Sequence, residues 1–231
     1  MIRTKLFLLG CLALLGVLAF APKAKTTRVV FLGDSITQAG VKPDGYISLL
    51  RNALERAGKG ADYELVGAGI SGNKVPDLQK RLEADVLAKK PDMVFVYIGI
   101  NDVWHFTHPS TVSVGGTLKD KYEAGLQDVI SRIKKSGAQV VLCTPTVIGE
   151  KHDGTNEQDK MLEEYAAISR QVAQKNNLPL CDLRKAFIEY LQANNAQNEE
   201  KGVLTSDRVH LNAAGNAFVA LQMMPFLEAR K

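Results

Sequence analysis

The sequence predicts an α/β fold, with a five-stranded parallel sheet between two layers of helices. Short apolar runs alternate with longer amphipathic stretches along the 231 residues, a pattern typical of repeated strand and helix units. Most of the apolar runs lack the polar and apolar alternation of a half-exposed sheet, so we expect both of their faces to be buried. With right-handed crossovers, five such units form the flavodoxin-like three-layer sandwich.

The expected strands are the short runs of mostly apolar residues. In chain order they cover residues 28–32, 63–67, 93–98, 139–143 and 178–183. Chemistry in parallel sheets gathers at the carboxyl ends of the strands. The residues that follow each run are therefore the candidates for function.

Helices are expected wherever apolar residues recur with helical spacing. In chain order these stretches cover residues 46–57, 75–89, 118–136, 156–175, 183–193 and 213 to about 230. Asn212 is the expected N-cap of the last helix. Pro225 is expected to kink or divide that helix, because proline removes a backbone donor.

The first 21 residues are typical of a secretory signal peptide. Arg3 and Lys5 precede an apolar run from residue 6 to residue 20, and alanines stand at positions 19 and 21, as signal peptides require. The run is shorter than the roughly 20 apolar residues of a spanning helix. We therefore expect export to the periplasm or the cell exterior, with one mature domain over residues 22–231.

A lipid anchor is the less favoured alternative for this segment. Leu8-Leu9-Gly10-Cys11 resembles a lipoprotein signal, in which the cysteine is acylated. The apolar run continues for nine residues past Cys11, whereas an acylation site of that kind ends the run. No stable membrane insertion is expected once the signal has been removed.

Charge and cysteine content narrow the class of protein further. Removal of Arg3 and Lys5 lowers the formal net charge from +4 to +2, too little to predict binding of nucleic acid or an anionic membrane. Cys143 and Cys181 remain, each in an apolar strand-like run. An exported protein could pair them, but two buried thiols are favoured, because nothing in the sequence places them in disulfide geometry.

Four polar segments stand where one pocket at the carboxyl edge of the sheet could collect them. They are Gly33-Asp34-Ser35, Gly69-Ile70-Ser71-Gly72-Asn73, Gly99-Ile100-Asn101-Asp102 and Asp207-Arg208-Val209-His210. The first three follow the first three expected strands, and the last precedes the final helix. Singly, such segments are common in turns. Their joint placement predicts a functional site.

These segments resemble, in the same order, the four signature blocks of the SGNH hydrolases, also called the GDSL lipase and esterase family. The resemblance spans residues 33–210. Two positions depart from the residues most common in the family's motifs: Ile36 stands in place of leucine, and Arg208 stands where a glycine often follows the aspartate. The resemblance implies the three-layer fold and ester hydrolysis at a serine, without a metal or an organic cofactor.

Ester cleavage by Ser35 needs an adjacent base, because a serine hydroxyl is a poor nucleophile at neutral pH. His210 is the candidate from the last block, since an imidazole can also return the proton to the leaving alcohol. Asp207, three residues earlier, can hold that imidazole in one tautomer. Taken alone, Ser35 has a second interpretation, as the cap of the helix that follows it.

The resemblance also implies an oxyanion hole, a set of donors for the negative charge that develops on the carbonyl oxygen. Residue by residue, these donors are the backbone N–H groups of Ser35 and Gly72 and the side-chain amide of Asn101. The missing Cβ of Gly72 allows a carbonyl oxygen to approach closely. Asp34 and Asp102 are expected to brace loops through hydrogen bonds to the backbone.

Spacing alone does not select the base, because Asp102 precedes His105 by three residues as Asp207 precedes His210. His210 is chosen because it lies in the last block, while Asp102 belongs to the third. His105 and His108 also suggest a zinc site. We disfavour that alternative, because no cysteine or further carboxylate cluster accompanies them.

Residues 103–116 are long for a strand-to-helix connection, and long loops in compact domains are often functional. We expect Trp104, Phe106 and Tyr46 to line an acyl or sugar pocket. Arg208 is expected to project toward the same pocket. The alternative is that Trp104 packs beneath its own loop.

The substrate class is predicted from what the sequence lacks. It has no evident long apolar tunnel or lid helix, so we expect a short-chain ester, such as an acetyl group on a carbohydrate. A lysophospholipase or thioesterase of the same family, and a non-catalytic glycan-binding module, are the alternatives. Phosphoryl chemistry ranks last, because the lysine and the spacing of a P-loop are missing.

Overall fold

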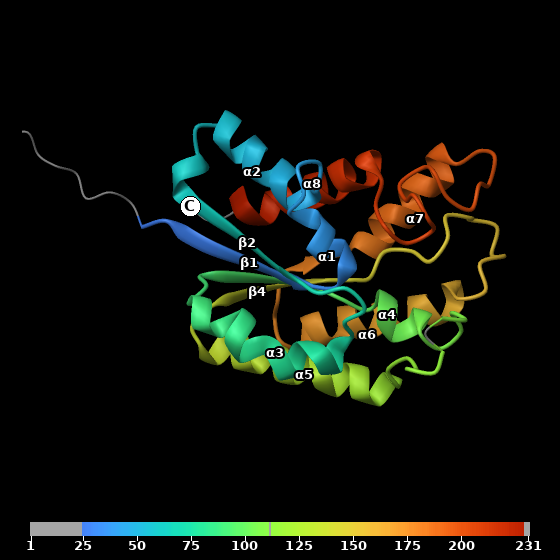
Figure 1. The fold of residues 1–231 in the computed structure, drawn as a ribbon, viewed down its shortest axis with the longest axis horizontal. Coiled ribbons are helices and arrows are strands. Elements are labelled where there is room, and N and C mark those ends of the chain that lie inside the picture. Colours follow the sequence, from blue (N-terminus) through green and yellow to red (C-terminus); the bar gives the residue numbers. More distant parts are fainter. Residues whose placement is uncertain (1–24, 111, 229–231) are drawn as a thin grey trace, which may run out of the picture.

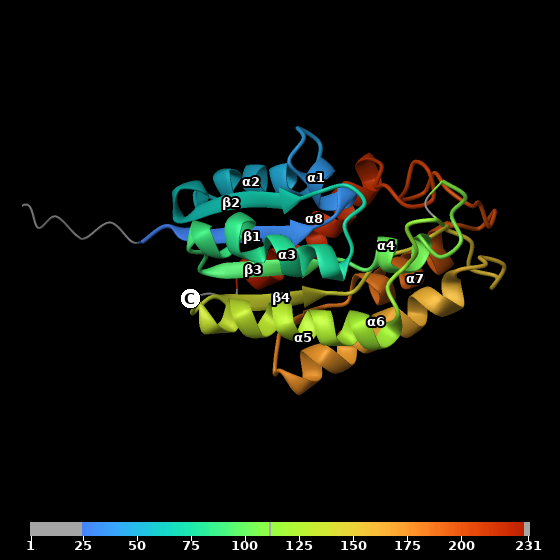
Figure 2. The same cartoon turned by 60° about the horizontal axis from the view of Figure 1, so that its bottom comes forward.

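The chain forms a five-stranded parallel sheet with helices on both of its faces (Figure 1), as the sequence predicts. The computed structural model describes residues 25–110 and 112–228. The predicted signal peptide and Cys11 lie outside these residues. The strands are β1 (Thr27–Gly33), β2 (Tyr63–Gly69), β3 (Met93–Tyr97), β4 (Gln139–Cys143) and β5 (Leu180–Cys181), and their order is β2-β1-β3-β4-β5 (Figure 2).

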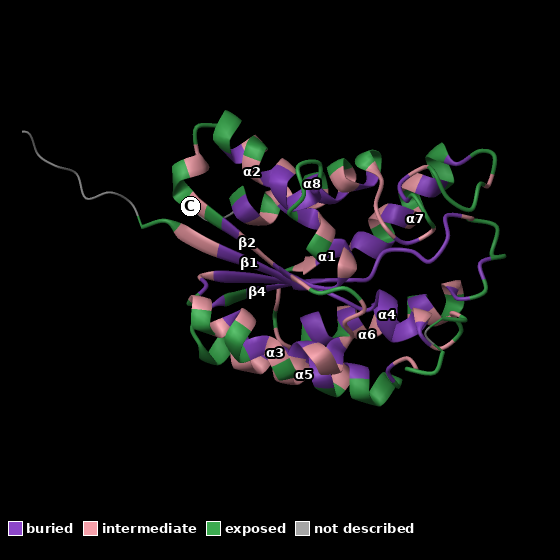
Figure 3. Ribbon diagram, viewed as in Figure 1, coloured by how far each residue is buried: buried purple, intermediate pink, exposed green. Residues whose placement is uncertain are grey.

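Two strands differ from their predictions. The fifth was expected over residues 178–183, but β5 has only two residues, since it pairs with β4 only at Leu180 and Cys181 before the next helix begins. The expectation of burial on both faces is wrong for β2, whose residues are mostly half-exposed (Figure 3). Because β2 is an edge strand with β1 as its one neighbour, its surface is covered less completely than that of β1, β3 or β4.

Helices occupy all of the predicted stretches, with two short additions. They are α1 (Ser35–Gly40), α2 (Tyr46–Arg56), α3 (Val75–Asp85), α4 (Ile100–Trp104), α5 (Lys119–Lys135), α6 (Asp159–Lys175), α7 (Leu183–Asn194) and α8 (Ala213–Glu228). The short helices α1 and α4 follow the first and third polar segments, so both lie at the carboxyl edge of the sheet. The stretch predicted over residues 75–89 ends as a separate 3₁₀ turn, Leu87–Lys89.

The last helix departs from one prediction and confirms another. Helix α8 continues through Pro225 as a single element, so the expected division does not occur. Asn212 caps it as predicted, because its Oδ1 accepts the backbone N–H of Gly215 at 2.9 Å.

Two helical layers enclose the sheet. Helices α1, α2, α7 and α8 cover one face, and α3, α5 and α6 cover the other (Figure 1). Between them, β1, β3 and β4 carry a core of β-branched and aromatic side chains, in which Phe31 and Phe95 stack with ring centroids 4.9 Å apart. This rigid centre holds the strand ends in fixed relative positions.

The cysteines of the described chain are two buried free thiols, as predicted. Cys143 and Cys181 occupy paired positions on β4 and β5, and burial raises the pKa of the Cys143 thiol. Among the residues that the structure describes, no helix combines the length and apolar character needed to cross a membrane.

Arg184 links α7 to α6 and to the segment after β4. Its side chain is 2% exposed. It donates to Asp159 Oδ1 at 2.6 Å, to Glu163 Oε2 at 3.0 Å and to the carbonyl of Thr146 at 3.1 Å. A buried guanidinium is stable only when its donors are satisfied in this way.

We expect Arg184→Met to lower the free energy of unfolding by about 3 kcal/mol, because the carboxylates of Asp159 and Glu163 and the carbonyl of Thr146 each lose one donor. Lys185→Met is the matched control. Lys185 is 66% exposed, its ammonium lies 3.7 Å from Glu189, and its loss should cost less than about 0.5 kcal/mol. Urea unfolding of both variants measures the difference, and equal losses would contradict this role for Arg184.

Candidate active site

The four polar segments meet at the carboxyl edge of the sheet. Ser35 is the first residue of α1, directly after β1 and Asp34, and Gly72 lies in the turn after β2. Asn101 lies in α4, after β3. Asp207 and His210 lie on a loop that runs from residue 200 to α8, closed by a bridge between residues 205 and 211.

Ser35, His210 and Asp207 form a continuous chain of hydrogen bonds. Ser35 Oγ lies 2.9 Å from His210 Nε2, and His210 Nδ1 lies 2.7 Å from Asp207 Oδ2. Asp207 Oδ1 also accepts the backbone N–H groups of His210, at 2.7 Å, and of Val209, at 3.1 Å. The carboxylate therefore holds both the ring and the backbone of the histidine.

The environment of Asp207 keeps its carboxyl ionised. Partial burial raises its pKa, but the hydrogen bonds from the backbone and ring of His210 and from the backbone of Val209 outweigh that effect, so its pKa lies below the ordinary value. Arg208 has a φ of +85°, a left-handed conformation that favours glycine.

Asp34 and Asp102 brace the backbone, as predicted. Asp34 Oδ1 accepts the N–H of Ile36 at 2.9 Å, and Asp102 Oδ1 accepts the N–H of Val75, at the start of α3, at 3.0 Å. Burial raises the pKa of Asp34 to about 6 and that of Asp102 to about 7, against the lowering effect of these hydrogen bonds.

Arg81, which the sequence analysis did not single out, ties the first two segments together. Its guanidinium donates to the carbonyls of Gly33, at 2.7 Å, and Ala68, at 2.9 Å, and to Asn73 Oδ1 at 2.6 Å. Asn101 Nδ2 in turn donates to the carbonyl of Asn73 at 3.1 Å. In sequence, Arg81 is one charged residue on an amphipathic helix, a pattern typical of a solvated face.

Gln38 also supports the turn that contains Gly72. Its Oε1 accepts the backbone N–H of Ser71 at 2.8 Å. Gly72 has a φ of +76°, and no atom lies within 4 Å of the place a Cβ would occupy. The side of Gly72 on which a Cβ would stand is therefore open space.

A cleft of about 760 Å³ opens beside Ser35 and His210. Helix α1, the turn after it and the start of α8 form its other walls. The lining residues are Gln38, Ala39, Lys42, Pro43, Asp44, Gly45, Leu211, Asn212, Ala213 and Asn216. The cleft is therefore open, and polar side chains stand among apolar ones in its walls.

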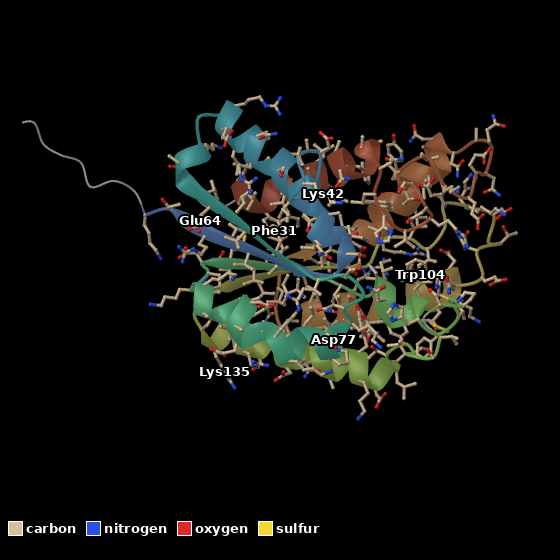
Figure 4. All side chains as sticks on the ribbon, in the orientation of Figure 1. Phe31, Lys42, Glu64, Asp77, Trp104 and Lys135 are labelled. Atoms are coloured by element: carbon tan, nitrogen blue, oxygen red, sulfur yellow. The ribbon has the colours of Figure 1, made fainter. Side chains whose placement is uncertain are left out.

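Trp104, one of the aromatic residues predicted to line the pocket, lies close to His210 but is not among the residues that line the cleft. Its ring centroid lies 6.4 Å from that of His210 and 4.5 Å from that of His108, beyond the carboxyl ends of the strands (Figure 4). Phe106 instead lines a separate hollow with Leu118 and neighbouring residues of α5 and α6.

Two more of the predicted lining residues are placed differently. Tyr46 is fully buried, and its hydroxyl donates to Thr37 Oγ1 at 3.0 Å. The expectation that it lines the pocket is wrong, because its ring fills the core beside Phe31. Arg208 pairs with Glu200, at 2.8 Å between Nε and Oε1, and is not among the residues that line the cleft.

The structure separates the two Asp-x-x-His pairs. Asp102 binds the backbone of Val75, while His105 is buried in the loop after α4 and burial lowers its pKa. His210 is the histidine that contacts Ser35. Within residues 25–110 and 112–228, no group of three or more potential ligands could hold a metal ion.

Comparison with known proteins identifies this arrangement. The GDSL-like lipase/acylhydrolase family matches residues 31–218. An acetylxylan esterase of Geobacillus stearothermophilus is 33% identical over 207 residues, covering 84% of this chain and 90% of that protein. The chain belongs to the GDSL-like lipase/acylhydrolase family. It is therefore a serine ester hydrolase of the SGNH type, as the four segments predicted.

The chain is also similar to a solved esterase structure and to a relative whose function is uncharacterised. The crystal structure of the acetyl xylan esterase AlAXEase has a TM-score of 0.83 and 50% identity, covering 87% of this chain and 99% of that one. An uncharacterised lipoprotein of Bacillus subtilis, YqeF, is 27% identical over 184 residues, covering 70% of this chain and 72% of that protein.

The raised pKa of Asp102 predicts a pH-dependent stability. Between about pH 4 and pH 7 the folded carboxyl holds a proton that the unfolded one has lost, so this group's contribution to stability falls as the pH rises. Asp102→Asn removes that contribution. The Tm of the variant minus that of the wild type should therefore be larger at about pH 8 than at about pH 5.

Asp120→Asn provides the control, because Asp120 is 70% exposed at the start of α5. Its Tm difference from the wild type should be similar at the two pH values. A Tm difference for Asp102→Asn that also stays constant would contradict the raised pKa.

Proposed function

We propose that the protein is an exported esterase that removes acetyl groups from carbohydrates through an acyl-enzyme on Ser35. The observation that carries this proposal is the hydrogen-bonded chain from Ser35 through His210 to Asp207, placed at an open cleft. A glycan-binding module on the same fold has no need of such a chain.

In the first half-reaction, Ser35 Oγ attacks the ester carbonyl carbon while His210 Nε2 takes the hydroxyl proton. Asp207 accepts the Nδ1 hydrogen, which leaves the Nε2 lone pair facing Ser35 and stabilises the imidazolium that forms. The tetrahedral intermediate collapses as Nε2 returns the proton to the sugar oxygen. The deacetylated sugar leaves, and acetyl-Ser35 remains.

In the second half-reaction, water replaces the sugar and His210 takes one of its protons. The resulting hydroxide attacks acetyl-Ser35, and acetic acid departs as Nε2 protonates Ser35 Oγ, then ionises to acetate by losing its proton to solvent. Both tetrahedral intermediates carry negative charge on the former carbonyl oxygen. The backbone N–H groups of Ser35 and Gly72 and the amide of Asn101 are the proposed donors to it.

The position of Asn101 supports its part in this set. One Nδ2 hydrogen is used by the carbonyl of Asn73, which fixes the orientation of the amide. A side-chain amide has two N–H donors, so the second remains available for the oxyanion. Because the amide is oriented before substrate binds, it needs little reorganisation during the reaction.

The substrate class is supported by the cleft and by the relatives. Acetylxylan esterases occur among both the sequence relatives and the similar structures. Lys42 and Asp44 present charged groups in the cleft wall, which suits sugar hydroxyls better than a long acyl chain. A lysophospholipase or long-chain thioesterase would need an extended apolar channel at Ser35.

Trp104 is the proposed acyl-side wall, because its ring lies next to that of His210. A flat aromatic surface there limits the room for the acyl group and keeps bulk water from the base. Arg208 is held by Glu200, so we assign it no part in binding the acetyl group.

Ser35→Ala should abolish acetate release from acetylated xylo-oligosaccharides without loss of the fold. Wild-type protein should release acetate, hydrolyse p-nitrophenyl acetate far faster than p-nitrophenyl palmitate, and gain one fluorophosphonate adduct at Ser35. Ser136→Ala, which alters a serine at the end of α5, should behave as wild type. A folded wild-type protein with neither adduct nor turnover would refute the proposal and favour glycan binding.

Asn101→Ala should lower kcat by about 10²-fold or more, with a much smaller change in KM, because an oxyanion donor acts mainly in the transition state. Initial rates on p-nitrophenyl acetate measure the effect. Circular dichroism spectra would establish that the variant keeps its fold, and near-native turnover would remove Asn101 from the oxyanion hole.

A further inference from the structure

The loop that carries Asp207 and His210 has little regular structure of its own. It is closed internally by backbone bonds from Gly202 to Thr205, from Ser206 to His210 and from Asn212 to Leu204. These bonds shape the loop, but none of them joins it to the sheet. Its position relative to Ser35 must therefore come from contacts with other segments.

The segment after β4 supplies such contacts, and Glu150 is their centre. The carboxylate of Glu150 is fully buried. Oε2 accepts the N–H of Val203 at 2.8 Å, while Oε1 accepts the N–H groups of Leu204 at 2.7 Å and Thr205 at 2.5 Å. Three consecutive backbone donors thus converge on one carboxylate.

The backbone around Glu150 reinforces this attachment on both sides. The N–H of Glu150 donates to the carbonyl of Glu200 at 2.9 Å, and the N–H of Gly149 donates to the carbonyl of Arg208 at 2.8 Å. Asn195 Nδ2 donates to the carbonyl of Glu150 at 2.9 Å. Residues 149–150 therefore form hydrogen bonds with the loop at residue 200, at residues 203–205 and at residue 208.

We propose that Glu150 is a positioning residue, whose buried carboxylate holds the loop bearing Asp207 and His210 at the distance from Ser35 that proton transfer requires. The proposal rests on the serine esterase function given above. A fully buried carboxylate is costly unless its oxygens are well bonded, and here the compensating groups are the backbone N–H groups of the loop itself. Displacing that carboxylate would move or loosen the loop that carries His210.

Glu150→Gln tests the proposal with almost no change in shape. The amide retains one acceptor oxygen and places an NH₂ donor against backbone N–H groups, so at least one of the three loses its acceptor. Because the bond from Asp207 to His210 lies within the loop, it should survive. His210 should therefore keep its hydrogen bond to Asp207, while the distance between His210 and Ser35 varies.

We expect kcat for p-nitrophenyl acetate to fall about 10-fold to 10²-fold, with KM within about twofold, because a displacement of about 1 Å has effects of this size. The acidic limb of the pH profile should keep its midpoint while the plateau falls. Fluorophosphonate labelling of Ser35 should slow by a similar factor. Amide hydrogen exchange should accelerate at residues 203–211 and not in β3.

Glu199→Gln is the matched control, since it makes the same change at an exposed carboxylate close to the loop. Its kcat and exchange should equal those of the wild type. If Glu150→Gln does not fold, Glu150→Asp keeps the charge on a shorter side chain, and a smaller loss of kcat with faster exchange at 203–211 is expected.

Wild-type kcat in folded Glu150→Gln, or exchange that rises equally in β3, would overturn the positioning role. Absence of labelling at Ser35 in the wild type would instead refute the esterase function. In that case the exchange at residues 203–211 still decides whether Glu150 holds the loop: unchanged exchange overturns the proposal, and faster exchange confined to the loop supports it.

Discussion

The hydrogen bond between Ser35 Oγ and His210 Nε2 is the constraint on which the rest of the site depends. It joins residues that are 175 positions apart in the chain, so its length of 2.9 Å is set by the packing of the whole domain. A base must lie within hydrogen-bond reach of the proton that it removes. The sheet, the short helix α1 and the loop before α8 together satisfy this requirement.

The register of the parallel sheet brings the starts of three of the four segments side by side. Gly33 pairs with Gly69 on β2 and with Tyr97 on β3, so the strands end side by side. A Cβ at Gly33 would lie 2.5 Å from the carbonyl of Tyr97, and one at Gly69 would lie 2.1 Å from the backbone nitrogen of Gln38. These glycines allow α1 to begin directly above the strand ends, where Ser35 is needed.

Buried carboxylates complete the site by binding backbone N–H groups. Asp34 binds the start of α1, Asp102 binds the start of α3 and Glu150 binds the loop before α8. Asp34 braces the turn at the start of its own helix, whereas Asp102 and Glu150 each link two segments that are far apart in the chain. Each of the three carries a desolvation cost that only correct geometry offsets. Polar contacts of this kind favour one arrangement of the loops over others, which suits a site whose distances must be accurate.

The sequence by itself determined the order of strands and helices along the chain and the identity of the polar residues at the strand ends. The apolar runs predicted the buried strands β1, β3 and β4 correctly, and Ser35, Asn101 and His210 stand in recognisable segments. The resemblance to a known family selected His210 over His105, and the structure confirmed the contact with Ser35. Only the tertiary structure decided that Tyr46 belongs to the core and that Arg81 and Glu150 join segments of the site. Those outcomes depend on distances between segments far apart in the chain, and local patterns of residues carry no information about such distances.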